Sequence, residues 1–142
     1  MTSDTAVGMR LIGVEREFAH PLEKVWRALT EGPLLEQWLM KNEFAPVVGH
    51  RFQFRAEPNP YWNGIVDSEV LELTPPDRLV LRWDSAGQET VVTWTLRPTD
   101  KGVLLRMEQT GFKGLQEANI KGAEYAWKKF VGQLEDVVAK MD

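Results

Sequence analysis

The sequence predicts an α+β fold in which a curved antiparallel sheet of about six strands wraps around one long C-terminal helix. Two observations favour this class. Most of the chain upstream of residue 114 alternates between apolar and polar side chains, as half-buried strands do. Residues 114–141 instead place apolar side chains three and four positions apart, which forms a single helical stripe. That stripe contains Ala123, Trp127, Phe130, Val131, Leu134, Val137, Val138 and Met141.

The first strand and two short helices precede the main run of strands. Residues 10–19 alternate strictly, and Arg16 shares the face of the apolar residues Val14 and Phe18. Pro21 then stands at a typical first helical position and is followed by apolar residues at helical spacing up to Gly32. Residues 33–39 repeat that spacing. We therefore expect two short helices between the first strand and the rest of the sheet.

Five further strands are expected at residues 51–56, 65–74, 78–84, 89–97 and 103–110. The segments between them are short, and the one at 57–64 contains two prolines and an Asn-Gly pair, which is typical of a turn. Such connections predict a meander. The strand at 65–74 leaves two alternatives open, because Val66 and Val70 compete with Leu71 and Leu73 for the inner face, and a bulge could switch them.

Composition excludes several classes of protein. At 142 residues the chain has the size of one domain, and we expect the whole of 1–142 to form it, with the small, polar residues 1–8 disordered. A net charge of −4 without clusters of Lys and Arg argues against nucleic acid and anionic membranes as partners. We see no secretory signal and no apolar run long enough to span a membrane, so the expected location is the cytoplasm.

Metal, cofactor and catalytic motifs are absent from the sequence. There is no cysteine, which excludes disulfides, thiolate metal sites and cysteine nucleophiles. The two histidines, His20 and His50, both stand at turn-like positions, and their spacing gives no reason for them to converge with carboxylates. We expect no metal, no cofactor and no catalytic residue.

The order of elements, together with several short motifs, resembles a known family. The opening Val14-x-Arg16-x-Phe18-x-x-Pro21 continues into a helix with Val25-Trp26 and then Trp38. Later segments with matching character begin at Val48-Gly49, Leu71-x-Leu73, Val103-x-Leu105 and Ala126-Trp127. Together they resemble the domain related to the activator of heat-shock protein 90 ATPase, in the START-like (SRPBCC) superfamily. The resemblance covers about residues 14–134 and implies the helix-grip fold.

Two departures qualify what this resemblance implies. Only Gly49 stands where members commonly carry paired glycines, and Ala126 replaces the glycine of a Gly-Trp pair. The eukaryotic activator also joins this domain to a separate chaperone-binding domain, for which the present sequence has no room. A chaperone partner is therefore possible, but chaperone activation is not implied. Short members of the family generally have no known ligand or reaction.

Aromatic residues supply most of the candidate ligand contacts. Six tryptophans is a high count for this length, and they either fill the core or line a cavity. Trp62 and Phe112 are expected at a pocket mouth, because both adjoin Gly- or Pro-rich loops. The full set of predicted ligand-binding residues is Arg16, Trp38, Phe54, Trp62, Trp83, Trp94, Met107, Phe112, Trp127 and Val131.

Arg16 allows two interpretations. Strand alternation places it on the inward face, where a guanidinium must find carboxylate or carbonyl partners. It could anchor an acidic group of a ligand within the cavity. Alternatively, it forms a structural ion pair near the end of the strand, and the family pattern, which carries Arg here in proteins of unlike function, favours that second interpretation.

Three functions follow from these observations. The first is a module that binds an apolar, aromatic or lipid-like small molecule in a cavity between the sheet and the C-terminal helix. The second is a chaperone-regulator type of interaction domain that uses an exposed apolar patch. The third is an enzyme of the cyclase or hydratase type, with Arg16 and Glu108 or Gln109 as candidates, although strand alternation directs Glu108 outward. We rank them in this order.

Overall fold

The computed structural model describes residues 11–114 and 117–141 of the chain. The expected disorder of residues 1–8 lies outside these described residues. Within them the elements follow in the order β1 (Leu11–Phe18), α2 (Leu22–Thr30), α3 (Gly32–Trp38), β2 (Lys41–Asn42), β3 (Arg51–Arg55), β4 (Ile65–Thr74), β5 (Arg78–Ser85), β6 (Gln88–Pro98), β7 (Val103–Thr110) and α4 (Glu117–Lys140).

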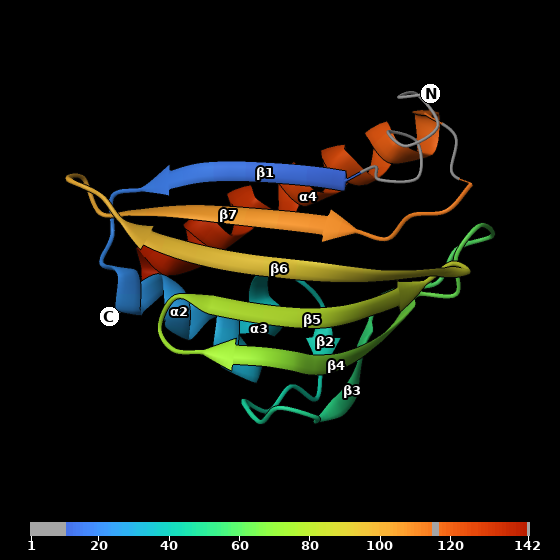
Figure 1. Cartoon of the computed structure of the whole chain (residues 1–142), viewed down its shortest axis with the longest axis horizontal. Coiled ribbons are helices and arrows are strands. Elements are labelled where there is room, and N and C mark those ends of the chain that lie inside the picture. Colours follow the sequence, from blue (N-terminus) through green and yellow to red (C-terminus); the bar gives the residue numbers. More distant parts are fainter. Residues whose placement is uncertain (1–10, 115–116, 142) are drawn as a thin grey trace.

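The strands form one antiparallel sheet in the order β1-β7-β6-β5-β4-β3-β2 (Figure 1). Its strands β3 to β7 are joined in sequence, so this part is the expected meander, and β1 closes the far edge by pairing with β7. The sheet has seven strands rather than about six, because the two-residue strand β2 adds to the edge of β3. Two residues are too few to show any alternation in the sequence.

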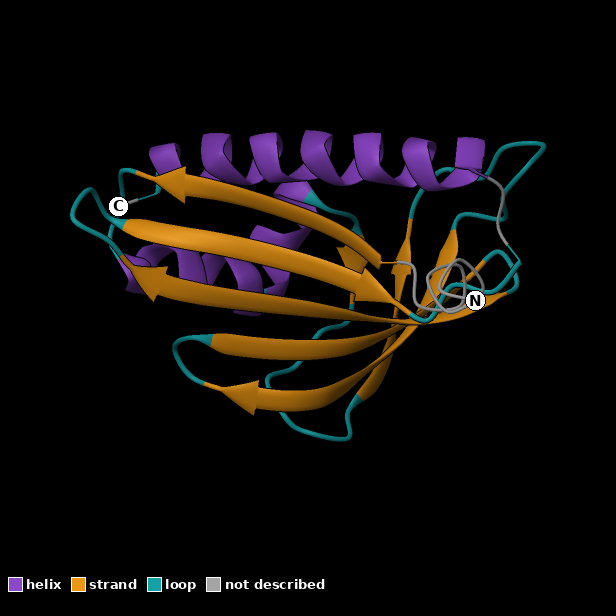
Figure 2. Cartoon of the chain, turned by 45° about the horizontal axis from the view of Figure 1, so that its top comes forward, coloured by secondary structure: helices purple, strands orange, loops and turns teal. Residues whose placement is uncertain are grey.

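Helix α4 lies along one face of the curved sheet, with α2 and α3 on the same side (Figure 2). Its buried residues are Ile120, Trp127, Val131, Leu134, Val137 and Val138, at the helical spacing that the sequence shows. The inward residues of β6 and β7 face this helix layer, and Trp94, Leu105 and Met107 are almost fully buried. Burial of this apolar surface is the main source of the fold's stability. The helix-grip architecture predicted from the sequence is confirmed.

A bulge settles which residues of β4 face inward. Val66, Ser68 and Val70 alternate into the core, and the register with β5 then shifts between Val70 and Glu72. The shift separates the first part of β4 from Leu71 and Leu73, which are only half-buried. Of the two alternatives left open by the sequence, Val66 and Val70 therefore take the buried positions. The bulge separates them from the half-buried Leu71 and Leu73.

None of the described helices is long and apolar enough to cross a membrane.

Candidate functional site

A pocket of about 380 Å³ lies between the sheet and the N-terminal half of α4. Strands β4, β5 and β7 supply its floor, and the segments after β7 and before β4 supply its rim. This end of the molecule holds both the start of α4 and the loop before β4 (Figure 1). The lining residues are Met40, Trp62, Val66, Trp83, Ser85, Ala86, Gln109, Phe112, Ala123, Ala126, Trp127 and Phe130.

The pocket opens into an adjoining hollow of about 800 Å³. The two share Trp62, Trp83, Gln109, Phe112 and other lining residues, so they form an inner and an outer part of one site. Asparagine and glutamine side chains appear only in the outer part, apart from Gln109, which borders both. Among the described residues, the inner part is therefore mostly apolar, and the outer part adds uncharged polar side chains to an apolar lining.

Trp127 lies at the centre of the aromatic wall. Its ring centroid is 5.0 Å from that of Trp83, 5.7 Å from that of Trp94 and 5.8 Å from that of Phe130. The tilted and edge-on arrangements are those that aromatic pairs prefer. Trp83 in turn packs at 5.1 Å from Phe54. Such a cluster holds the wall of the pocket in one shape.

A buried chain of hydrogen bonds runs beneath the pocket. The indole N–H of Trp127 donates to Oε1 of Gln109 at 2.7 Å, and Nε2 of Gln109 donates to the hydroxyl of Thr90 at 3.0 Å. The Thr90 hydroxyl donates to the backbone carbonyl of Trp83 at 2.6 Å. All three side chains are buried, so each of these bonds is shielded from water. The chain ties α4 to β7, β6 and β5.

At the mouth, Trp62 is fixed by Ser85. The indole N–H of Trp62 donates to the Ser85 hydroxyl at 2.8 Å, and that hydroxyl donates to the Ile65 carbonyl at 3.0 Å. The loop itself is closed by paired backbone bonds between Asn59 and Trp62. Its end at Gly64 has φ +80°, and a Cβ there would lie 2.3 Å from the Ala56 carbonyl oxygen, so only glycine fits.

The sequence-predicted ligand residues divide into two groups. Trp62, Trp83, Phe112 and Trp127 line the pocket, and Trp62 and Phe112 both stand on the loop segments expected for its mouth. A second group is buried in the core and does not line the pocket: Trp38, Phe54, Trp94, Met107 and Val131. Trp38 also places its indole N–H on the Ala28 carbonyl at 2.9 Å.

The expected burial of Arg16 is wrong. Its side chain is 46% exposed, and a guanidinium nitrogen lies 2.6 Å from a carboxylate oxygen of Glu135 on α4. Val14 and Phe18 on the same face are buried, but β1 is at the edge of the sheet, so a side chain as long as that of Arg16 reaches solvent beside the helix. Arg16 does not line the pocket. The structural ion pair, the second interpretation of the sequence, is the arrangement that the structure contains.

The residues weighed for an enzyme do not come together. Glu108 lies on the opposite face of β7 from Gln109 and accepts a hydrogen bond from Arg106 at 2.7 Å. Arg16 is occupied by Glu135. Among the described residues, no group of three or more histidines or carboxylates is arranged to hold a metal ion. His50 has a ring nitrogen 2.7 Å from the Glu43 carbonyl oxygen.

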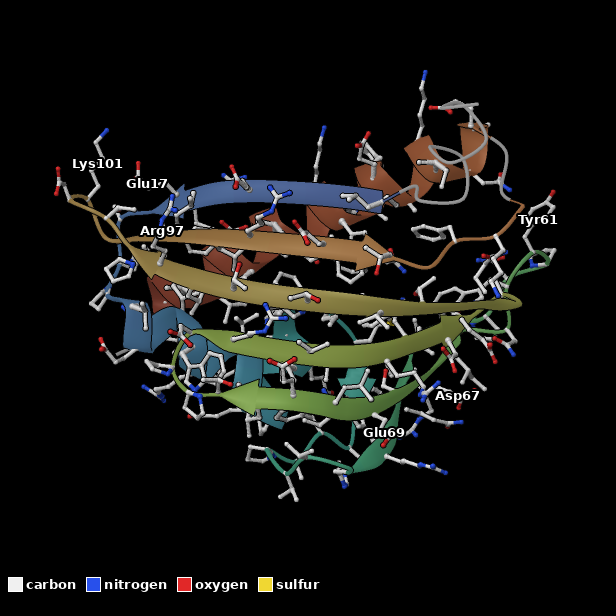
Figure 3. All side chains as sticks on the ribbon, viewed as in Figure 1. Glu17, Tyr61, Asp67, Glu69, Arg97 and Lys101 are labelled. Carbon is white, nitrogen blue, oxygen red and sulfur yellow. The ribbon has the colours of Figure 1, made fainter. Side chains whose placement is uncertain are left out.

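The outer face of the sheet holds a hollow of a different kind. Asp67 of β4 stands opposite Asp84 of β5, and Asp84 stands opposite Glu89 of β6. These three residues border a polar, open hollow of about 490 Å³. Burial, more than the neighbouring carboxylates, raises the pKa of Asp84 above its usual range, and Arg82 opposes the rise. Asp67 points away from the helix layer on this face (Figure 3).

Several pocket residues were missed by the sequence analysis. Ala123 and Ala126 belong to the inner stripe of α4, and their short side chains leave room where larger ones would fill the space. Gln109 was weighed only as a catalytic candidate, yet it occupies an inward position in β7 after Val103, Leu105 and Met107. The signal for Gln109 in the sequence was that it is a polar residue following apolar residues on the inward face of β7.

Comparison with known proteins agrees with this architecture. A crystal structure of protein MLL2253 from Mesorhizobium loti is 45% identical, with a TM-score of 0.85 over 94% of this chain and 99% of that one. The solution structure of BH1534 from Bacillus halodurans is 26% identical, with a TM-score of 0.76 over 91% and 96% of the two chains.

DynU16, a protein in the dynemicin biosynthetic locus, is 24% identical, with a TM-score of 0.79. The similarity covers 92% of this chain and 47% of DynU16, so it shows the fold alone. A comparison with curated proteins gives no match. Residues 19–139 match the family described as Activator of Hsp90 ATPase homolog 1-like protein. The chain therefore belongs to this family, and its fold is the helix grip of the START-like proteins.

Proposed function

We propose that this protein is a binding module for an apolar or aromatic small molecule, which occupies the pocket between the sheet and the N-terminal half of α4. The observation that carries the proposal is the lining of the pocket. Ten of its twelve residues are apolar, and the volume of about 380 Å³ is in the range of small-molecule sites. Trp62, Trp83, Phe112 and Trp127 would make the direct contacts.

Some residues that the sequence predicts as ligand contacts lie in the core instead, and in this proposal they support the pocket wall. Trp94 and Phe54 pack against the rings that line the pocket, so they would fix the wall rather than touch the ligand. One structural neighbour, DynU16, belongs to a biosynthetic locus. This shared fold is compatible with a small-molecule ligand, and the pocket lining carries the proposal.

The module is proposed as a binder without a catalytic residue. Proton transfer needs an acid or base within reach of the substrate, and neither the inner nor the outer part of the site is lined by a carboxylate, histidine, lysine or arginine among the described residues. A neutral wall of this kind holds a molecule without supplying a group that titrates near neutral pH.

A chaperone-type interaction surface is the second candidate. Val47 and Val48, between β2 and β3, are both exposed, and this adjacent apolar pair is the feature that favours it. The same family membership is compatible with either function. The pair is small beside the apolar patches that mark protein interfaces, so we place it after the pocket.

The test begins with native mass spectrometry of the protein purified from its own host. A bound molecule of defined mass would support the pocket, and its affinity can then be followed by quenching of tryptophan fluorescence. Ala126→Phe should abolish this binding, because the added ring fills the space beside Trp127. Ala139→Phe, on an exposed position of the same helix, is the matched control and should bind normally.

The outcome against the proposal is equally defined. Lipids, flavonoids and polyketides that give no saturable quenching, together with an empty native spectrum, would contradict the pocket as a ligand site. Recovery of a chaperone by the wild-type protein, but not by Val47→Asp, would then favour the second candidate.

A further inference from the structure

The amide of Gln109 has one possible orientation. The indole of Trp127 can only donate a hydrogen bond, so the atom that it meets must be the amide oxygen. The Thr90 hydroxyl has its hydrogen on the Trp83 carbonyl, so toward Gln109 it can only accept. Both neighbours therefore demand that Oε1 faces Trp127 and Nε2 faces Thr90. The orientation of the Gln109 amide is therefore assigned from its hydrogen-bond partners.

This orientation leaves one N–H of Gln109 available. A primary amide carries two N–H groups, and the structure uses one of them, on Thr90. The second N–H has no acceptor among the described residues. Gln109 is only 5% exposed and borders both parts of the pocket. A buried donor without a partner is costly, and a ligand acceptor would satisfy it.

The other polar side chain of the inner pocket has no free hydrogen to donate. Ser85 accepts from Trp62 and donates to the Ile65 carbonyl. No charged side chain lines either part of the pocket among the residues that the structure describes. An ionised ligand group that entered the inner part would lose its water without gaining a counter-charge, which is strongly unfavourable.

From these observations we infer that the pocket selects an uncharged, aromatic-sized molecule that carries a hydrogen-bond acceptor, such as a ketone carbonyl, and that Gln109 is the residue that determines this selectivity. The inference rests on the proposed binding function and adds the chemical class of its ligand. A fatty acid or another carboxylate would be disfavoured, because the described residues of the inner part offer it a neutral donor and no counter-charge.

Three probes of one shape separate these possibilities by isothermal titration calorimetry. They are 2-acetylnaphthalene, which is neutral and has an acceptor; 2-ethylnaphthalene, which is neutral and has none; and 2-naphthoate, which is an anion at pH 7. We expect the ketone to bind at least about threefold more tightly than the hydrocarbon. The anion should bind at least about tenfold more weakly than the ketone.

Gln109→Leu should remove the advantage of the ketone over the hydrocarbon, so that the ratio of their two affinities falls to about one. Gln53→Leu is the matched control, because the Gln53 amide donates to Asp67 on the outer face of the sheet. It should leave all three affinities unchanged. Unfolding in urea will show whether Gln109→Leu remains folded, since it also leaves the Trp127 N–H without its acceptor.

A measurement on the wild-type protein does not depend on that variant. The side-chain amide protons of Gln109 should shift in the NMR spectrum with the ketone and shift much less with the hydrocarbon. Equal affinities for all three probes, or no response of this amide, would overturn the selectivity and leave the pocket standing. Failure of all three probes to bind would overturn both the selectivity and the proposed function.

Discussion

Trp127 of α4 donates its indole N–H to the amide oxygen of Gln109 in β7 at 2.7 Å, within the buried core. This bond joins the helix to the sheet across a layer in which most of the described buried side chains are apolar. Because both groups are buried, the Trp127 N–H and the Gln109 oxygen cannot form hydrogen bonds with water instead, so loss of either partner leaves the other unsatisfied. The wall and the floor of the proposed ligand site are thus held by the same contact.

Trp127→Phe should destabilise the protein by about 2–4 kcal/mol, because it orphans the Gln109 oxygen and leaves a space beside Trp83. Urea unfolding followed by circular dichroism measures the change. A double-mutant cycle with Gln109→Leu should give a coupling energy of at least about 0.5 kcal/mol. Strict additivity of the two changes would contradict the role assigned to this bond.

Ser85→Ala should loosen the loop that carries Trp62. The variant removes the acceptor for the Trp62 indole, so the loop at 57–64 should open more often. Tyr61 is 95% exposed and points outward from this loop (Figure 3), so chymotrypsin can reach it. We expect cleavage there to become several-fold faster than in the wild type. Unchanged cleavage would show that the indole bond does not hold the loop.

Ser68→Ala should stabilise the protein. The Ser68 hydroxyl is buried in β4 and has no hydrogen-bond partner among the residues that the structure describes, and removal of an unsatisfied buried group recovers up to about 1 kcal/mol. The expected result is a higher midpoint in thermal unfolding. Ser68→Ala also serves as a serine-to-alanine comparison for Ser85→Ala, which is expected to lower the midpoint of thermal unfolding rather than raise it. A loss of stability would indicate that the hydroxyl has a partner after all.

Arg16→Ala should have a small effect on stability and none on ligand affinity. The Arg16–Glu135 pair is 46% and 31% exposed, and exposed ion pairs contribute about 0.2–1 kcal/mol. Moderate salt should reduce even this contribution. Titration of the variant with the neutral probes tests the second part. A large loss of affinity would restore the interpretation of Arg16 as an anchor for the ligand.

Asp84→Asn should stabilise the protein at pH 7 by less than about 1 kcal/mol, because it removes a charge that burial and, to a smaller extent, the neighbouring carboxylates disfavour. Burial raises the folded-state pKa of Asp84 above its ordinary value of 3.8. The folded state therefore favours the protonated acid, and this contribution is present below pH 3.8 and lost as the pH rises through the folded pKa.

The pH dependence gives the decisive comparison for this variant. The difference in melting temperature between wild type and Asp84→Asn should be largest at neutral pH and should vanish below pH 3.8. Arg82 lies 3.8 Å from the Asp84 carboxylate and works in the opposite direction. A variant that is less stable at pH 7 would show that this ion pair outweighs burial.

Local patterns in the sequence were enough to determine the fold. The stripe on the last helix and the alternation in residues 92–96 and 103–107 both match burial in the structure. This succeeds because each pattern repeats with the period of its own element, so several residues carry the same signal. The expectation that Trp62 and Phe112 stand at a pocket mouth came instead from the Gly- and Pro-rich loops beside them, and both residues line the pocket.

Only the tertiary structure decided which rings line the pocket and which fill the core. Trp94 and Trp127 are both inward-facing, but short alanines beside Trp127 leave space there, whereas Trp94 packs edge-on against Trp38 at 5.6 Å. Arg16 faces inward yet reaches solvent, because β1 lies at the sheet edge. Periodicity records the direction of a side chain, while exposure and free volume depend on neighbours from distant parts of the chain.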